Sequence, residues 1–153
     1  MRRLVYIFVL MAFAVSCQVD STPLYDNPFV YLATGEGAGS VIVGADADVV
    51  NTYYMMLSSK SFDEDIVVEY EAVAGSGLQE GVDYSIITEG RSIRFLPGIF
   101  KMPIRIRWMP NEVGADKDNT LRLRITHSNV PLTYGLPGPD ACNRELVITK
   151  RNL

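Results

Sequence analysis

The sequence predicts an all-β fold, an antiparallel β-sandwich of about seven or eight strands. After Cys17, short runs rich in β-branched and aromatic residues recur, with Gly and Pro between them. The same region contains no convincing segment with apolar residues at the i, i+3, i+4, i+7 spacing of an amphipathic helix. The runs that we expect to form strands are residues 29–33, 49–57, 65–73, 82–88, 91–96, 102–109, 120–126 and 145–150.

Three of these runs alternate apolar and polar residues with a period of two, which is typical of strands with one buried face. The side chains expected to point inward are Ile66, Val68, Tyr70 and Ala72 in the first run, Ile104, Ile106 and Trp108 in the second, and Leu121, Leu123 and Ile125 in the third. The charged side chains expected to point outward are Glu69, Glu71, Arg105, Arg107, Arg122 and Arg124. One face of each run should therefore line a core.

Residues 1–16 have the pattern of a bacterial export signal. Arg2 and Arg3 precede an unbroken apolar stretch at residues 4–15, which fits the apolar region of a secretory signal. A membrane-spanning helix needs about 20 apolar residues, so this stretch is too short to be one. We expect residues 1–16 to be a signal peptide that is removed from the mature protein.

Residues 14–17, Ala-Val-Ser-Cys, resemble the lipobox of bacterial lipoproteins, in which small residues precede a cysteine that receives lipid. The resemblance implies that Cys17 is lipidated and anchors the mature protein to a membrane, although Ala14 stands where a leucine is usual. The alternative is ordinary cleavage near the same place, which leaves Cys17 unmodified. Residues 17–27 are mostly polar, and we expect them to form a flexible tether to a single domain at residues 28–153.

The charge balance argues against nucleic acid as a partner. The whole chain has 14 Lys and Arg against 18 Asp and Glu, a net charge of −4. Removing residues 1–16 takes away Arg2 and Arg3, so 12 positive residues remain against 18 negative ones, which gives −6. A protein that binds a phosphate backbone needs clustered positive charge, and this sequence has none. The second cysteine, Cys142, cannot form an intramolecular disulfide if Cys17 carries lipid.

No pattern of residues predicts catalysis, a cofactor or zinc. His127 is the single histidine, and no G-x-S-x-G turn accompanies it, so we expect an exposed histidine at a strand end. The Gly-rich residues 35–39 lead into strand-like residues 41–43, whereas a dinucleotide-binding loop leads into a helix. Zinc would require paired Cys or His at ligand spacing. We therefore expect a protein that is not an enzyme and that holds no cofactor.

Four segments together resemble a Calx-β domain: residues 81–84 (Gly-Val-Asp-Tyr), 93–98 (Ile-Arg-Phe-Leu-Pro-Gly), 104–106 (Ile-Arg-Ile) and 119–123 (Asn-Thr-Leu-Arg-Leu). They follow the family's order and spacing, and the resemblance covers roughly residues 51–150. With the lipobox and the loop at residues 134–140, the chain looks like the small Calx-β-like lipoproteins of gut Bacteroidota, which are often encoded beside polysaccharide-uptake systems. The resemblance implies an immunoglobulin-like accessory domain attached to the outer membrane, and it implies no reaction.

Some Calx-β domains bind calcium through acidic residues at one end of the sandwich. Glu112, Asp116 and Asp118 occupy the corresponding loop of this sequence. A calcium site needs about six to eight oxygen ligands, and here Lys117 interrupts the acidic residues. The alternative is a solvated loop without metal.

The immunoglobulin-like strand order predicts which strands are neighbours. It places residues 65–73 beside residues 120–126, so that outward glutamates face outward arginines and have a structural role. It also places residues 49–57 beside residues 102–109, with Tyr53, Met55 and Leu57 pointing inward. The outward side chains expected to form a binding surface are Tyr54, Met56, Arg105 and Arg107, with Arg94 flanking them. Large apolar groups in the open often mark an interaction surface, and the alternative is a patch whose members satisfy one another.

The loop at residues 128–143 is long and rich in Pro and Gly, and loops of this length in compact domains are often functional. Tyr134 could offer a face for stacking on a sugar, and the alternative is a rigid cover over the end of the sandwich. The hypothesis that follows is an outer-membrane lipoprotein of the cell envelope that acts as an accessory module, binds a glycan or a partner protein, and is linked to polysaccharide uptake. The alternative is a structural or assembly component that pairs through an exposed sheet edge.

Overall fold

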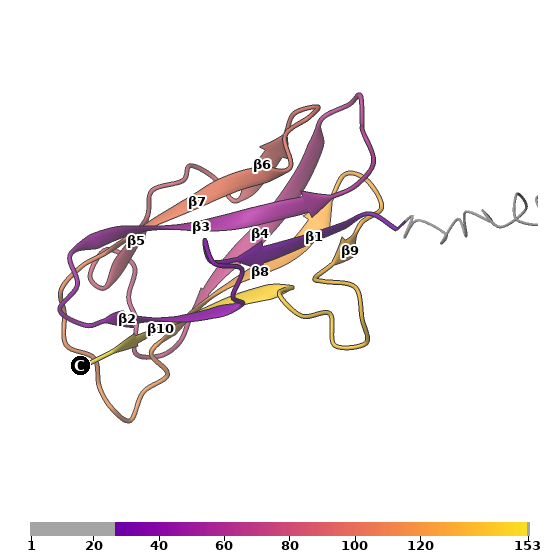
Figure 1. The fold of residues 1–153 in the computed structure, drawn as a ribbon. Coiled ribbons are helices and arrows are strands. Elements are labelled where there is room, and N and C mark those ends of the chain that lie inside the picture. Colours follow the sequence, from indigo (N-terminus) through magenta and orange to yellow (C-terminus); the bar gives the residue numbers. More distant parts are fainter. Residues whose placement is uncertain (1–26, 153) are drawn as a thin grey trace, which may run out of the picture.

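The computed structural model describes residues 27–152, and this part of the chain folds into ten β-strands without a helix (Figure 1). The predicted signal, Cys17 and most of the predicted tether lie outside the described residues. The strands are β1 (Phe29–Ala33), β2 (Ser40–Gly44), β3 (Val49–Ser58), β4 (Ile66–Ala74), β5 (Tyr84–Ile86), β6 (Ser92–Phe95), β7 (Lys101–Trp108), β8 (Thr120–Ser128), β9 (Thr133–Tyr134) and β10 (Glu145–Arg151). Nothing within residues 27–152 has the length and apolar character of a membrane-spanning helix.

The strands form two five-stranded sheets that pack face to face, which confirms the predicted β-sandwich. Sheet A has the order β5-β7-β3-β1-β9, and sheet B has the order β2-β10-β8-β4-β6. Two pairings are parallel, β1 with β9 and β2 with β10, and the others are antiparallel. The structure thus has ten strands where seven or eight were expected. The two that the expected runs do not include, β2 and β9, each pair in parallel with a strand that is distant in the chain.

The core lies between the two sheets and follows the predicted alternation. Nine of the ten side chains expected to point inward are buried, and Ala72 is half-buried against them. Trp108, at the end of β7, is fully buried in this core, where its Nε1 donates a hydrogen bond to the Tyr53 hydroxyl over 3.3 Å. Because the indole is buried, this bond satisfies a donor that water cannot reach.

Both predicted strand neighbours are confirmed. β4 lies beside β8, and Arg124 Nη1 contacts Glu71 Oε1 at 3.3 Å. A register shift between Glu69 and Tyr70 puts Glu69 opposite His127 and not opposite an arginine. Similarly, β3 lies beside β7 along eight residue pairs, from Val49 with Trp108 to Met56 with Lys101.

The strands run between two ends of the sandwich (Figure 1). At the N-terminal pole, where the described chain begins at Asn27, lie the connections β3–β4 (residues 59–65), β6–β7 (residues 96–100) and β8–β9 (residues 129–132). At the C-terminal pole lie the connections β2–β3, β4–β5 and β7–β8, together with the end of β10. Any chain that precedes residue 27 therefore joins the domain at the N-terminal pole.

Candidate binding surfaces

The outer face of sheet A contains the four residues that the sequence predicted as a binding surface. Along the register, Tyr54 lies between Ala33 of β1 and Pro103 of β7, and Met56 lies between Tyr31 and Lys101. Tyr54 and Met56 are half-buried, whereas Arg105 and Arg107 are exposed. The four residues thus share one face, and their inward neighbours Tyr53, Met55 and Leu57 are buried as predicted.

The neighbours of Tyr54 differ from the prediction. The ammonium of Lys101 lies 3.9 Å from the centre of the Tyr54 ring, which is a cation–π contact worth about 0.5–1 kcal/mol at an exposed site. Arg105 and Arg107 pair instead with Thr52 and Val50, farther along β3. A lysine therefore occupies the place beside the tyrosine that we assigned to the arginines.

Arg94 does not flank this surface. It lies on β6, which pairs with β4 at the edge of sheet B, and its guanidinium is 3.4 Å from Asp65 Oδ2. The prediction was wrong because alternation along one run does not reveal which sheet the run joins. Only the pairing with β4, which belongs to the other sheet from β7, decides this.

Positive charge on the outer face of sheet A is poorly balanced. Lys101, Arg105 and Arg107 all project from β7, and only Arg107 has a carboxylate partner among residues 27–152, Asp48 at 3.1 Å. No ion pair of Arg105 is found in the described part of the chain. This face therefore keeps a positive excess on a chain whose net charge is negative.

The outer face of sheet B, in contrast, neutralises its own charges. Arg124 contacts Glu145 at 2.7 Å and Glu71 at 3.3 Å, and Arg122 contacts Glu145 at 3.6 Å and Asp118 at 3.8 Å. The hydrogen bond and negative charge of Glu145 raise the pKa of Arg124 above its ordinary value. These charges satisfy one another, which agrees with the structural role predicted for the pair of strands.

A buried ion pair lies near the C-terminal pole, and sequence reasoning missed it. Lys150 Nζ donates to Asp83 Oδ1 over 2.9 Å and to the Met109 carbonyl over 2.9 Å. Burial raises the pKa of the Asp83 carboxyl, but hydrogen bonds from Asn111, Lys150 and the Gln79 amide outweigh this effect and hold the pKa below its ordinary value. The alternation along β10 could have indicated that Lys150 is buried, because Lys150 lies on the same face of the strand as Leu146 and Ile148.

The predicted calcium ligands do not come together. Asp118 Oδ1 accepts hydrogen bonds from the hydroxyl and the amide of Thr120, and these interactions lower the pKa of Asp118. Glu112 borders a different hollow from the one that Asp118 borders. Within residues 27–152 no group of three or more His, Cys, Asp or Glu side chains could hold a metal ion. The loop with Glu112, Asp116 and Asp118 therefore has no geometry that supports calcium binding.

The remaining predicted site residues lie apart from one another. Tyr134 is half-buried on β9, packs against the core and has its hydroxyl 3.2 Å from Ser128 Oγ, so its ring covers the sandwich more than it faces solvent. His127 is exposed near the end of β8, as expected. Cys142 is an exposed free thiol, and Cys17 lies outside the described residues.

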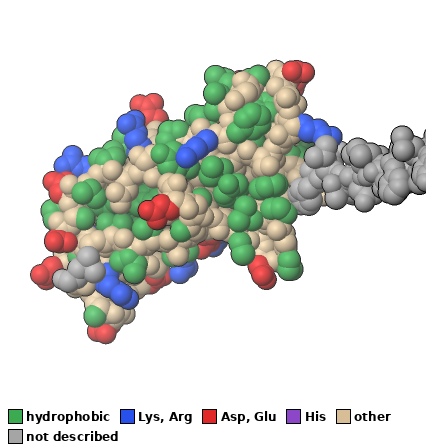
Figure 2. Space-filling model, in the orientation of Figure 1, with side chains coloured by type: hydrophobic (Ala, Val, Ile, Leu, Met, Phe, Trp, Pro, Cys, Tyr) green, Lys and Arg blue, Asp and Glu red, His purple; other side chains and the backbone are tan. Residues whose placement is uncertain are grey.

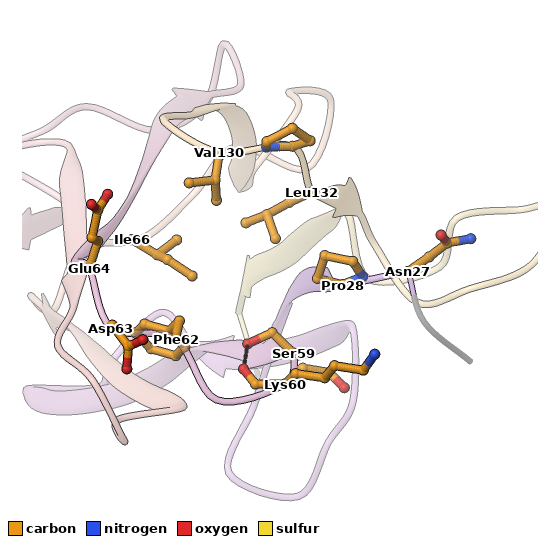
Figure 3. A pocket seen from close by; sticks show the side chains of 12 residues that line it. Asn27, Pro28, Ser59, Lys60, Phe62, Asp63, Glu64, Ile66, Val130 and Leu132 are labelled. Carbon is orange, nitrogen blue, oxygen red and sulfur yellow. Dashed lines mark hydrogen bonds between the residues drawn. The ribbon is translucent and has the colours of Figure 1, made fainter. Parts of the chain in front are cut away.

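A hollow of about 770 Å³ opens at the N-terminal pole (Figure 3). It lies between the β3–β4 and β8–β9 connections, and Phe62, Ile66, Val130 and Leu132 project into it. Its full lining is Asn27, Pro28, Ser58, Ser59, Lys60, Phe62, Asp63, Glu64, Ile66, Val130, Pro131 and Leu132. The sequence had no local signal for this site, because its walls come from segments that are far apart in the chain.

Comparison of the chain with models of known protein families gives no match, and comparison with curated proteins finds no matching sequence.

Proposed function

We propose that the chain is an outer-membrane lipoprotein, anchored through Cys17, that acts as a non-catalytic binding module. Its ligand is an acidic surface of a partner protein, and the outer face of sheet A is the surface that contacts it. The observation that supports this proposal is the uncompensated positive charge of Lys101 and Arg105 beside the half-buried Tyr54 and Met56. The resemblance to Calx-β-like lipoproteins suggests that the partner belongs to a polysaccharide-uptake system.

The charge pattern favours this face over the others. A positive face on a chain of net charge −4 attracts an acidic partner and orients it during encounter, because complementary potentials steer association. The arginines of sheet B are engaged with carboxylates on their own sheet. A partner that displaced those carboxylates would lose as many ion pairs as it formed, whereas a carboxylate placed beside Arg105 adds one.

The environment of the aromatic rings favours a protein over a glycan. Trp108 and the tyrosines Tyr53, Tyr70 and Tyr84 are buried and offer no ring face to a sugar. Lys101 covers one face of Tyr54, and Tyr31 stacks on Phe29 with ring centres 6.0 Å apart. A mixed surface of tyrosine, methionine and arginine is, by contrast, typical of contacts between proteins.

A structural role through sheet-edge pairing has weaker support. The four edge strands, β5, β9, β2 and β6, have three, two, five and four residues. Short edge strands are a device that limits pairing with other chains. The face of sheet A is therefore the better candidate for contact with a partner.

Photo-crosslinking in intact cells tests the proposal. A photoreactive amino acid replaces Thr52, next to Arg105 on the outer face of sheet A, or Thr149 on sheet B as the matched position. We expect a discrete protein adduct from position 52 and none from position 149. The double substitution Lys101→Glu, Arg105→Glu should abolish the adduct, because it reverses the charge of the face.

Arg151→Glu is the control for the charge reversal, since Arg151 is exposed at the end of β10 in sheet B. It should leave the adduct from position 52 unchanged. Loss of the adduct in this control would mean that overall charge, and not the face of sheet A, drives binding. An adduct with a polysaccharide would show that the ligand is an acidic glycan and not a protein. Equal adducts from positions 52 and 149 would contradict the proposal that the outer face of sheet A is the binding surface.

A further inference from the structure

Exposed apolar side chains gather at the N-terminal pole. In the β6–β7 connection, Leu96, Ile99 and Phe100 are 50%, 42% and 38% exposed. Figure 2 shows hydrophobic side chains concentrated near the point where the grey chain meets the domain. Large apolar groups that cluster in the open mark contact sites far more often than isolated ones do.

The local backbone holds this loop in a defined shape. Pro97 and Gly98 form a tight turn in which the Ile99 amide donates to the Leu96 carbonyl over 2.9 Å, and Gly98 has a φ of +83°. The Phe100 carbonyl accepts a hydrogen bond from the Leu57 amide at the end of β3 over 2.9 Å. The fold therefore presents Leu96, Ile99 and Phe100 outward as a fixed tip.

The tip is continuous with the apolar hollow. Phe100 packs edge-on against Phe62 of the β3–β4 connection, with ring centres 5.5 Å apart and an angle of 83° between the rings. Phe62 in turn lines the hollow with Ile66 and Leu132 (Figure 3). The pole thus carries one apolar surface, which we call the apolar cap, made of Phe62, Leu96, Ile99, Phe100 and the hollow.

The apolar cap lies at the end of the domain where a lipid at Cys17 would be attached. Asn27 and Pro28 line the hollow, and Cys17 precedes Asn27 by ten residues. An extended chain spans at most about 3.3–3.6 Å per residue, so ten residues keep Asn27, at the edge of the hollow, within roughly 35 Å of Cys17. A lipid at Cys17 and the apolar cap would therefore both reach the same membrane surface.

Charges around the cap are nearly balanced. Lys60, Asp63 and Glu64 line the hollow, Lys101 directly follows Phe100 at the start of β7, and Arg94 is paired with Asp65. Without a clear excess of positive charge, the cap has no electrostatic preference for anionic lipids. Its contact with a membrane would depend on its apolar side chains.

We propose that the apolar cap docks on the lipid bilayer, with Leu96, Ile99 and Phe100 entering the boundary between headgroups and acyl chains. This inference rests on the proposed anchoring at Cys17. Because a lipid at Cys17 already holds the domain at the membrane, a weak apolar contact is enough to set its orientation. Docking also sets the strands upright on the membrane and leaves the outer face of sheet A turned sideways, open to a partner (Figure 1).

Tryptophan quenching in vesicles tests the docking. The full-length lipoprotein is extracted from membranes and incorporated into phosphatidylcholine vesicles whose acyl chains carry bromine, a quencher of tryptophan emission. The variant Phe100→Trp reports from the cap, and Val82→Trp, an exposed site at the C-terminal pole, is the matched control. The native Trp108 is buried and serves as a constant background.

We expect loss of emission from the tryptophan at position 100 and none from that at position 82, to the same extent in neutral vesicles and in vesicles with anionic lipid. Adding Leu96→Ser and Ile99→Ser to Phe100→Trp should restore the emission. Vesicle-bound protein without quenching at position 100, or with equal quenching at both positions, would overturn the docking. If the wild type fails to bind vesicles and matches Cys17→Ala in this respect, the proposed anchoring itself fails, which is a separate result.

Discussion

Replacing Lys150 by methionine removes one charge of a buried ion pair while keeping a side chain of similar length. Lys150 is 1% exposed and Asp83 is 3% exposed, so neither charge reaches bulk water. After the substitution the Asp83 carboxylate keeps the hydrogen bonds from Asn111 Nδ2 over 2.9 Å and from the Gln79 amide over 2.8 Å. The Met109 carbonyl loses its lysine donor.

Breaking a buried pair from one side costs about 3–5 kcal/mol, because a charge is left without a partner in the interior. Because Asp83 keeps two hydrogen-bond donors, we expect Lys150→Met to lower the free energy of unfolding by about 3 kcal/mol, at the lower end of this range. Asp83→Asn should cost more, about 4 kcal/mol, because the buried ammonium then faces only neutral oxygens and the new amide NH2 cannot accept the hydrogen bond from the Gln79 amide. The double variant should cost clearly less than the sum of the two, since it leaves no unpaired charge.

Urea unfolding of the four proteins measures these free energies through the transition midpoint, with m values that should stay constant. A cost below about 1 kcal/mol for Lys150→Met would refute the reasoning, since such a value is typical of exposed pairs. A double variant whose loss of stability equals the sum of the two single losses would also refute the reasoning. The comparison requires only purified protein and does not depend on knowing the ligand.

The pKa of Asp83 adds a test against pH. Because hydrogen bonds lower this pKa in the folded protein, the native state favours the charged carboxylate. The stability contributed by the group is complete above the ordinary pKa of about 4 and is lost as pH falls through the lowered value. The difference in stability between the wild type and Asp83→Asn should therefore be largest near neutral pH and shrink in acid. A difference that grows in acid would contradict the assignment.

Two further substitutions probe the core and a connecting loop. Tyr53→Phe removes the hydroxyl that accepts the hydrogen bond of the buried Trp108 Nε1 and should lower the free energy of unfolding by about 1–3 kcal/mol. An unchanged urea midpoint would show that this hydrogen bond contributes nothing to stability. Gly135→Ala should cost well over 1 kcal/mol, because Gly135 has a φ of +96° and a methyl group there would collide with the Ala141 carbonyl. Gly98→Ala is its control, with a φ of +83° and open space around the glycine, and it should cost only about 1 kcal/mol; equal thermal stabilities would contradict the clash.

Features that depend on neighbouring residues could be predicted from the sequence. The period of two in β7 alone identifies Ile104, Ile106 and Trp108 as inward side chains, because successive residues of a strand point to opposite faces. Eight of the ten strands were predicted from short β-rich runs between Gly and Pro, and three of those runs show this alternation. The outward positions of Arg105 and Arg107 follow from the same rule.

Features that depend on contacts between distant segments needed the tertiary structure. Arg94 lies on the other sheet from Tyr54 because β6 pairs with β4, and the β-bulge beside Glu69 shifts the partners of β8. The apolar cap and the Lys150–Asp83 pair likewise assemble residues that are far apart in the chain. Alternation determines on which face of its own strand a side chain lies, but it contains no information about the strand that comes to lie beside it. That choice is made by the packing of two complete sheets, and it determined which of the predicted surface residues became neighbours.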